Sequence, residues 1–90
     1  MSILEACAAV MPLAKLAANE GNPNSISDAG VAAEMAHAGA QGGAMNVLIN
    51  LADIEDEAFC NEMKAKVEEI LLFVNEQLMK IRKTVIAAIL

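Results

Sequence analysis

Apolar positions recur every three or four residues along most of the chain, which is the spacing of one face of an α-helix. The pattern is interrupted at Gly21-Asn22-Pro23 and again near Asp53. Gly21 and Pro23 mark a helix end, because glycine readily adopts positive φ and proline cannot continue the hydrogen-bond ladder. The pattern therefore predicts an all-α domain of three helices, at about residues 3–19, 26–51 and 54–88.

The ends and the interior of the first two predicted helices carry local signals. Pro12 lies inside the first helix, where it removes an N–H and clashes with the preceding turn, so we expect a kink or separate first turns. The segment Ser25-Ile26-Ser27-Asp28 fits a capping box, in which the Ser25 hydroxyl and the Asp28 carboxylate accept hydrogen bonds from unpaired N–H groups. The second helix is thus expected to begin near Ile26.

A stripe of small residues runs along the second predicted helix. Its members are Ala29, Ala33, Ala36, Ala40, Gly43 and Val47. Each glycine in a helix interior costs about 1 kcal/mol relative to alanine, so we interpret the stripe as a surface against which another helix packs closely. The alternative is that Gly42-Gly43 marks a kink or a break.

The third predicted helix is very long, at over 30 residues or about 50 Å. Its acidic first turn, Asp53-Ile54-Glu55-Asp56, suits the positive end of the helix dipole. An apolar seam steps along it by three or four residues. The seam consists of Cys60, Met63, Val67, Ile70, Val74, Leu78, Ile81 and Val85.

The length of this helix leads to a prediction about assembly. A typical domain of 100 residues has a diameter of roughly 26 Å, so two shorter helices are expected to leave part of the seam uncovered. Soluble monomers avoid large exposed apolar patches. We therefore predict a homo-oligomeric antiparallel helical bundle, most simply a two-fold dimer, with contacts through the long C-terminal helix and the small-residue helix.

Composition and charge exclude several classes of function. The chain is 57% apolar and 2% aromatic, and its net charge is −6, which argues against nucleic acid as a partner. The longest apolar runs are too short to span a bilayer, and no signal-peptide pattern opens the sequence. We expect a cytoplasmic protein without membrane contact.

The cysteines and the single histidine are the other candidates for chemistry. Cys7 and Cys60 lack C-x-x-C or zinc-ligand spacing, so we expect no metal and two buried thiols in a reducing compartment. A catalytic thiol acting with His37 is the alternative. Glu34, His37 and Gln41 share one helix face, either as a proton-transfer pair of histidine and carboxylate or as a solvated polar face.

A second polar face carries Asp28, Asn46 and Asn50. Asp28 and Asn46 are 18 residues apart, so on one helix they are separated by about 27 Å at 1.5 Å per residue. They cannot line one small-molecule site within a single chain.

Two segments carry a resemblance to a known family. Residues 21–33 read G-N-P-N-S-I-S-D-A-G-V-A-A, and residues 46–51 read N-V-L-I-N-L. In this order the chain resembles the formiminotetrahydrofolate cyclodeaminase / methenyltetrahydrofolate cyclohydrolase family. The resemblance covers roughly Leu4 to Met63, and the long third helix matches in character only. It implies that residues 1–90 form a single helical domain similar to the C-terminal half of a cyclodeaminase domain.

The resemblance also implies a function in folate one-carbon metabolism. Members of the family are helical and oligomeric and act on tetrahydrofolate derivatives, by closing the ring of the formimino form with release of ammonia or by hydrolysing the methenyl form. Asp28 occupies one of the family's motif positions, and if the chain is an enzyme we expect general acid and base chemistry to fall to polar groups such as Asp28 and His37. The residues that the resemblance assigns to binding are Asn22, Asn24, Ser27, Asn46 and Asn50, together with the motif residue Ser25. The alternative roles are structural, with Ser25 and Asp28 capping a helix and Asn46 and Asn50 pairing backbone groups between helices.

The sequence departs from the family in one respect. Family domains are longer and carry a Gly-rich, P-G-G-G-S-like segment in their earlier half, which this sequence does not contain. Two hypotheses follow. One is a small enzyme whose site lies between subunits, with a partner chain as a possible source of the missing half. The other is a non-catalytic helical module for oligomerisation or for binding a small ligand.

Overall fold

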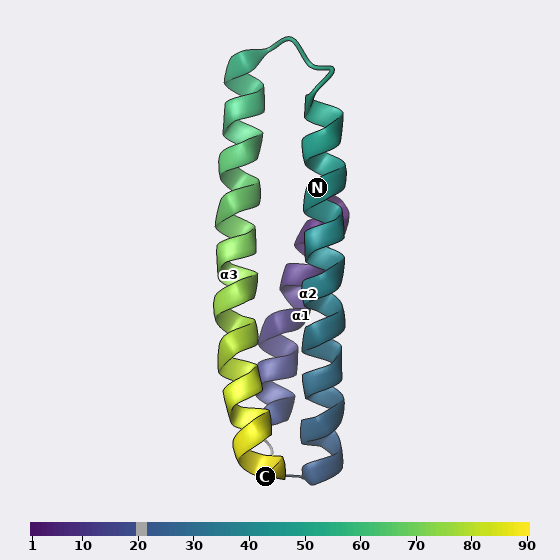
Figure 1. Ribbon diagram of the computed structural model, residues 1–90, viewed down its shortest axis with the longest axis vertical. Helices are drawn as coiled ribbons and strands as arrows, with labels where there is room; N and C mark the ends of the chain where they lie inside the picture. Colours follow the sequence, from purple (N-terminus) through teal and green to yellow (C-terminus); the bar gives the residue numbers. More distant parts are fainter. Residues whose placement is uncertain (20–21) are drawn as a thin grey trace.

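The described residues form three helices that run down, up and down along a rod in the view of Figure 1. A computed structural model describes residues 1–19 and 22–90. The helices are α1 (Ser2–Ala18), α2 (Pro23–Leu51) and α3 (Glu57–Ile89). The rod measures 50 × 17 × 15 Å. The all-α class and the three helices are confirmed, and Gly21, the predicted helix end, lies outside the described residues.

Two helices begin at other residues than the pattern predicts. Helix α2 begins at Pro23, three residues earlier than expected, because Asn22 is its N-cap and accepts a hydrogen bond from the Asn24 backbone N–H at 3.0 Å. Proline is well suited to the first helical position, where its missing N–H costs nothing. The predicted capping box of Ser25 and Asp28 is therefore wrong, since both residues lie within the helix.

Helix α3 begins at Glu57, three residues later than predicted. Asp56 is its N-cap, and the Asp56 carboxylate accepts a hydrogen bond from the Phe59 backbone N–H at 3.0 Å. Residues 53–56 lie in the connection between α2 and α3. The expected acidic first turn is thus wrong in its position, and Glu57 is the acidic residue of the first turn.

Helix α1 is continuous from Ser2 to Ala18 with Pro12 inside it. Separate first turns are therefore excluded. Pro12 is exposed, whereas Leu4, Met11 and Ala14 are buried. The proline thus lies on the outer side of the helix, away from the core.

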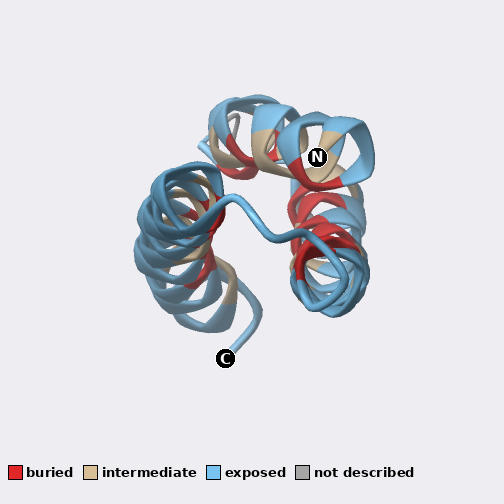
Figure 2. Ribbon diagram, turned by 90° about the horizontal axis from the view of Figure 1, so that it is seen from above, coloured by how far each residue is buried: buried red, intermediate tan, exposed pale blue. Residues whose placement is uncertain are grey.

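The small-residue stripe of α2 faces the centre of the bundle, where the buried residues of all three helices meet (Figure 2). Ala33 and Ala40 are fully buried, and Ala44 continues the stripe. Helix α2 is unbroken through Gly42 and Gly43. The packing interpretation is confirmed, and a break at these glycines is excluded.

Two glycines of α2 let α1 approach closely. A Cβ atom at Gly43 would lie 3.1 Å from the Leu4 backbone nitrogen and 3.3 Å from the Leu4 Cα. A Cβ at Gly39 would lie 2.7 Å from the Cys7 Sγ. Gly42, by contrast, has open space around the position of a Cβ. The contact between α1 and α2 therefore depends on Gly39 and Gly43 lacking side chains.

The apolar seam of α3 is covered by α1 and α2 of the same chain. Five of its members are buried and three are partly buried. The expectation of an uncovered seam is wrong, because α2 has 29 residues and follows α3 along most of its length. Oligomerisation stays a prediction and must rest on other surfaces.

The two cysteines are free. The thiol of Cys60 is buried and lies 3.5 Å from the Ile54 carbonyl oxygen and 3.6 Å from that of Leu51, at the end of α2. Cys7 is half-buried against α2. Burial is thus confirmed for Cys60 and is partial for Cys7. Within the described residues, no helix has the length and apolar character needed to cross a bilayer.

Candidate functional site

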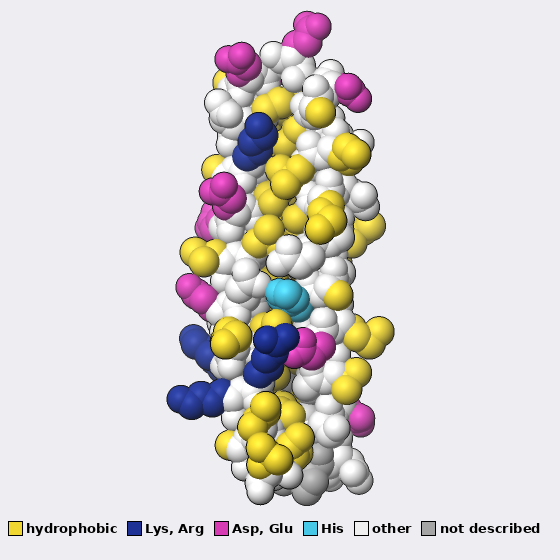
Figure 3. All heavy atoms as spheres, viewed as in Figure 1, with side chains coloured by type: hydrophobic (Ala, Val, Ile, Leu, Met, Phe, Trp, Pro, Cys, Tyr) yellow, Lys and Arg dark blue, Asp and Glu magenta, His cyan; other side chains and the backbone are white. Residues whose placement is uncertain are grey.

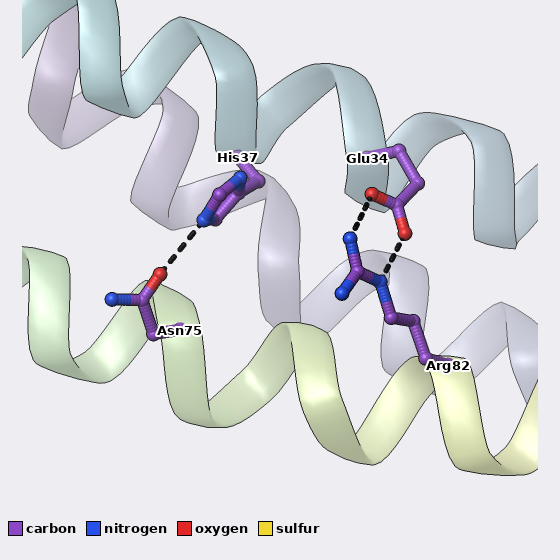
Figure 4. Close-up of polar contacts among 4 residues, drawn as sticks. All are labelled: Glu34, His37, Asn75 and Arg82. Carbon is purple, nitrogen blue, oxygen red and sulfur yellow. Dashed lines mark hydrogen bonds and ion pairs between the residues drawn. The ribbon is translucent and has the colours of Figure 1, made fainter.

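Four polar side chains connect α2 to α3 on the face of the rod that lies away from α1 (Figure 4). The Arg82 guanidinium donates two hydrogen bonds to the Glu34 carboxylate, one from Nε to Oε1 and one from Nη2 to Oε2, the latter at 2.7 Å. The His37 Nε2 and the Asn75 Oδ1 are 2.7 Å apart, so His37 donates to Asn75 in the tautomer protonated at Nε2. Glu34 and His37 therefore each bond to α3 rather than to one another.

The ion pair between Glu34 and Arg82 shifts the pKa of both side chains. Hydrogen bonding from Arg82 lowers the pKa of Glu34 below its ordinary value of 4.5. Partial desolvation opposes this shift, and the electrostatic interaction with Arg82 and, to a smaller extent, with His37 supports it. The Glu34 carboxylate in turn raises the pKa of Arg82. Both side chains are therefore charged at neutral pH.

The lowered pKa of Glu34 leads to a prediction about stability. A carboxyl whose pKa is lower in the folded than in the unfolded chain stabilises the fold above its unfolded pKa. That contribution disappears as the pH falls through the lowered, folded-state pKa. We expect the stability difference between wild type and Glu34→Gln to be full well above pH 4.5 and lost at lower pH. Urea unfolding of both proteins across this range measures it.

A control separates the ion pair from the general loss of one negative charge. Glu62 forms an ion pair of 3.6 Å with Lys66 on the same helix, so Glu62→Gln removes a surface carboxylate without touching the contact between α2 and α3. If both variants lost the same amount of stability with the same pH dependence, the role assigned to Arg82 would be contradicted.

The binding residues implied by the family motif lie in two groups on α2. Asn22, Asn24 and Ser27 are exposed at the start of the helix, and the Asn22 side chain already accepts a hydrogen bond from the backbone. Asn46 and Asn50 are exposed near the other end. These two asparagines therefore do not pair backbone groups between packed helices. Helix α2 is unbroken, so the two groups are separated by several turns.

The structure does not bring Asp28 and His37 together. They are nine residues apart on one continuous helix, which corresponds to about 13 Å along the axis and to opposite sides of the helix. Asp28 is exposed on the side of Asn46, but about 27 Å from it. Within one chain, the predicted residues do not form a single site.

A surface groove of about 380 Å³ lies between α2 and α3 beside the ion pair. Among the residues that line it are Ser27, Gly30, Glu34, Arg82, Val85 and Ile86. A Cβ at Gly30 would lie 3.2 Å from both γ-carbons of Val85, so this glycine allows close packing at the floor of the groove. Of the binding residues that the family resemblance implies, Ser27 contributes to this lining.

Sequence reasoning missed Asn75 and Arg82. They lie 38 and 48 residues from their partners along the chain, and no local motif marks them. The available signal was the antiparallel order of α2 and α3. In two antiparallel helices, the residue numbers of facing residues add up to nearly the same total along the whole contact. In the part of the chain that the structure describes, no three side chains of His, Cys, Asp or Glu are grouped so that they could hold a metal ion.

Comparison with known families shows whether the motif resemblance reflects family membership or chance. The sequence matches the family described as Formiminotransferase-cyclodeaminase over residues 1–69, well over half of the chain. The chain belongs to this family. The resemblance carried by residues 21–33 and 46–51 is thereby confirmed. The family match ends within α3, so that Asn75 and Arg82 lie beyond it while Glu34 and His37 lie inside it.

One relative shows how much of a family member this chain represents. The chain is 43% identical over 65 residues to a methenyltetrahydrofolate cyclohydrolase of Methylorubrum extorquens. The alignment covers 72% of this chain but 31% of the relative. This member of the formiminotransferase-cyclodeaminase family thus spans less than a third of that relative's length. No solved structure matches the chain.

Proposed function

We propose that this chain acts in folate one-carbon metabolism, as part of a site that hydrolyses methenyltetrahydrofolate. The observation that carries the proposal is the 43% identity to a protein named for this reaction. Closure of the formiminotetrahydrofolate ring with release of ammonia is the second reaction implied by the family. One reaction opens and the other forms the same five-membered ring, and both need proton transfer at its nitrogens.

Hydrolysis of the methenyl form requires a group that accepts and then returns a proton. Water adds to the methenyl carbon while a base takes one of its protons. That proton is returned to the ring nitrogen that departs as the C–N bond breaks, and the remaining hydroxyl proton is released to solvent as the formyl carbonyl forms. A carboxylate such as that of Asp28 or an imidazole such as that of His37 performs such transfers in enzymes. Asparagine side chains both donate and accept hydrogen bonds, so Asn46 and Asn50 are suited to the amide-like edge of a pterin.

The separation of these residues supports a site shared between subunits. Asp28 and His37 are on opposite sides of α2, and Asn46 is about 27 Å from Asp28. We infer that each group forms one side of a site that another subunit completes. That subunit is a second copy or a partner chain that supplies the Gly-rich half of the family domain.

A hydrolysis assay tests this proposal. The purified chain is expected to accelerate the loss of the methenyl absorption band of methenyltetrahydrofolate. Asp28→Ala or His37→Ala should lower the rate by about 10²-fold or more if the residue transfers a proton. Asn46→Ala should lower it too. Asn61→Ala is the matched control, because Asn61 is an exposed asparagine of α3 inside the family match, and it should leave the rate unchanged.

A second candidate is a non-catalytic helical module that assembles or binds a small ligand. This second function applies if no other subunit completes the groups of residues that lie apart along α2. Calorimetry with folinic acid distinguishes the two functions. Heat of binding without any loss of the methenyl band would favour the module, whereas neither heat nor band loss would overturn the link of the isolated chain to folate.

A further inference from the structure

The His37 ring and the Asn75 amide face one another across the contact between α2 and α3. His37 is the single histidine of the chain, is half-buried, and reaches the surface midway along the rod, beside a basic and an acidic side chain (Figure 3). Its Nε2 is 2.7 Å from the Asn75 Oδ1. A carbonyl oxygen accepts hydrogen bonds and cannot donate them, so the ring donates from Nε2–H. The free lone pair of the neutral ring is then on Nδ1.

The neighbouring ion pair holds α2 and α3 in the register that this hydrogen bond needs. Glu34 lies one turn before His37 on α2, and its partner Arg82 lies two turns after Asn75 on α3. Residues three and seven positions apart lie on one face of a helix. The two contacts are therefore neighbours on the same side of the rod, and neither helix can slide past the other without breaking both.

The charges around the ring suit a proton acceptor. The charged groups drawn beside His37 are Glu34 on its own helix and Arg82 on α3 (Figure 4), and Glu34 interacts more strongly with Arg82 than with His37. Helix α1 lies on the opposite side of the rod (Figure 2). Asn75 is uncharged, so it orients the ring without the negative partner that would favour the imidazolium form. A neutral imidazole with a free lone pair is what a general base requires.

We propose that Asn75 is a positioning residue, which holds the His37 ring in the tautomer that leaves Nδ1 free to act as the general base of the hydrolysis. The inference rests on the proposed function. As water adds to the methenyl carbon, Nδ1 takes one of its protons while Nε2 keeps its own proton, bonded to Asn75. Nδ1 then returns the proton to the ring nitrogen that departs as the C–N bond breaks, and the hydroxyl proton goes to solvent as the formyl carbonyl forms. Asn75 lies beyond the family match, so the assignment comes from the contact between the helices.

NMR of the ring nitrogens tests the hydrogen bond directly, because the signals of a single histidine are unambiguous. We expect the neutral wild-type ring to carry its proton on Nε2 alone. Asn75→Leu keeps the approximate size of the side chain but removes the acceptor, so both tautomers should appear. Asn75→Asp keeps an acceptor, so the single tautomer should persist, and the added negative charge should move the titration of His37 to higher pH. A wild-type ring protonated on Nδ1, or a mixture as large in wild type as in Asn75→Leu, would overturn the proposal.

Rates of methenyltetrahydrofolate hydrolysis above the uncatalysed rate test the link to catalysis. Asn75→Leu should lower this rate by about 10-fold, an effect comparable with loss of the hydrogen bond that orients a metal-bound histidine. Asn75→Asp should retain the rate at alkaline pH, and the acid limb of its pH–rate profile should move to higher pH, because a base acts only when it is unprotonated. A merely structural role for Asn75 would leave that limb in place. An active chain whose Asn75→Leu variant changes tautomer but not rate would overturn the positioning role.

Gln77→Leu is the matched control. Gln77 lies two residues further along α3 and lines a groove together with residues of α1, so this substitution removes an amide from the other side of the helix. The tautomer of His37 and the rate should both match those of the wild type. Circular dichroism shows whether each variant is folded. A wild-type chain without hydrolysis would overturn the proposed function, whereas the NMR result decides independently whether Asn75 holds the ring.

Discussion

Ile81→Ala is expected to lower the free energy of unfolding by about 2–5 kcal/mol. Ile81 is 1% exposed and belongs to the core of the bundle. Its truncation loses the burial of three carbon atoms and leaves a cavity that rigid neighbouring helices fill incompletely. Small domains are stable by only about 5–15 kcal/mol, so a substantial part of the stability is at stake. Urea unfolding at fixed protein concentration measures the change.

The matched control for this substitution is Ile89→Ala. Ile89 lies two turns further along α3 and is 56% exposed, so the same chemical change there should have almost no effect. The comparison also tests a structural point, because residue 81 lies beyond the family match, which ends at residue 69. Equal losses at Ile81 and Ile89 would show that the second half of α3 does not pack as described.

Gly43→Leu is expected to destabilise the chain by about 1–3 kcal/mol through overpacking. The new Cβ would come within 3.1 Å of the Leu4 backbone nitrogen. A backbone atom cannot rotate away as a side chain does, so α1 must move off α2. This strain outweighs the gain of about 1 kcal/mol that replacement of a helical glycine otherwise brings.

The adjacent glycine supplies the control. A Cβ at Gly42 meets open space, so Gly42→Leu should raise stability by somewhat less than about 1 kcal/mol through helix propensity alone. Thermal unfolding of the two variants should therefore shift in opposite directions. A stabilised Gly43→Leu protein would show that the contact between α1 and α2 tolerates a side chain at this position.

The number of helices and their core faces followed from the sequence because both depend on apolar periodicity. The first residues of α2 and α3 did not follow from the sequence, because more than one residue near each start can act as an N-cap. Asn22 with Pro23 prevailed over Ser25 at α2, and Asp56 prevailed over the earlier Asp53 at α3. Asn, Asp and Ser are about equally favoured as N-caps, so residue type alone does not rank them.

The prediction that part of the α3 seam is uncovered was wrong for a geometric reason. The prediction assumed the diameter of a sphere-like domain, whereas the chain is a rod 50 Å long. Helix α2 is itself about 43 Å long, so it can follow α3. The apolar side chains of α3 that remain exposed lie outside this seam and include Leu72, Met79 and Ile86.

The candidate site was predictable only in part. The family motif fixed the membership of the chain, because it depends on residues that are close in sequence. The distance between Asp28 and Asn46 depends on α2 being unbroken between them, which periodicity alone left open at Gly42-Gly43. The bonds of Glu34 and His37 to Arg82 and Asn75 required the register between two helices, which no single segment encodes.

The down-up-down order of the helices also bears on how the chain folds. Each helix packs on the next one along the chain, so the contacts near each connection join residues that are close in sequence, whereas the contacts of α1 with α3 span the whole of α2. Chains dominated by local contacts reach their native state in microseconds to milliseconds, because little loop-closure entropy is lost before packing begins. The pair of α1 and α2, brought together at Gly39 and Gly43, is therefore suited to form early and to serve as the surface on which α3 condenses.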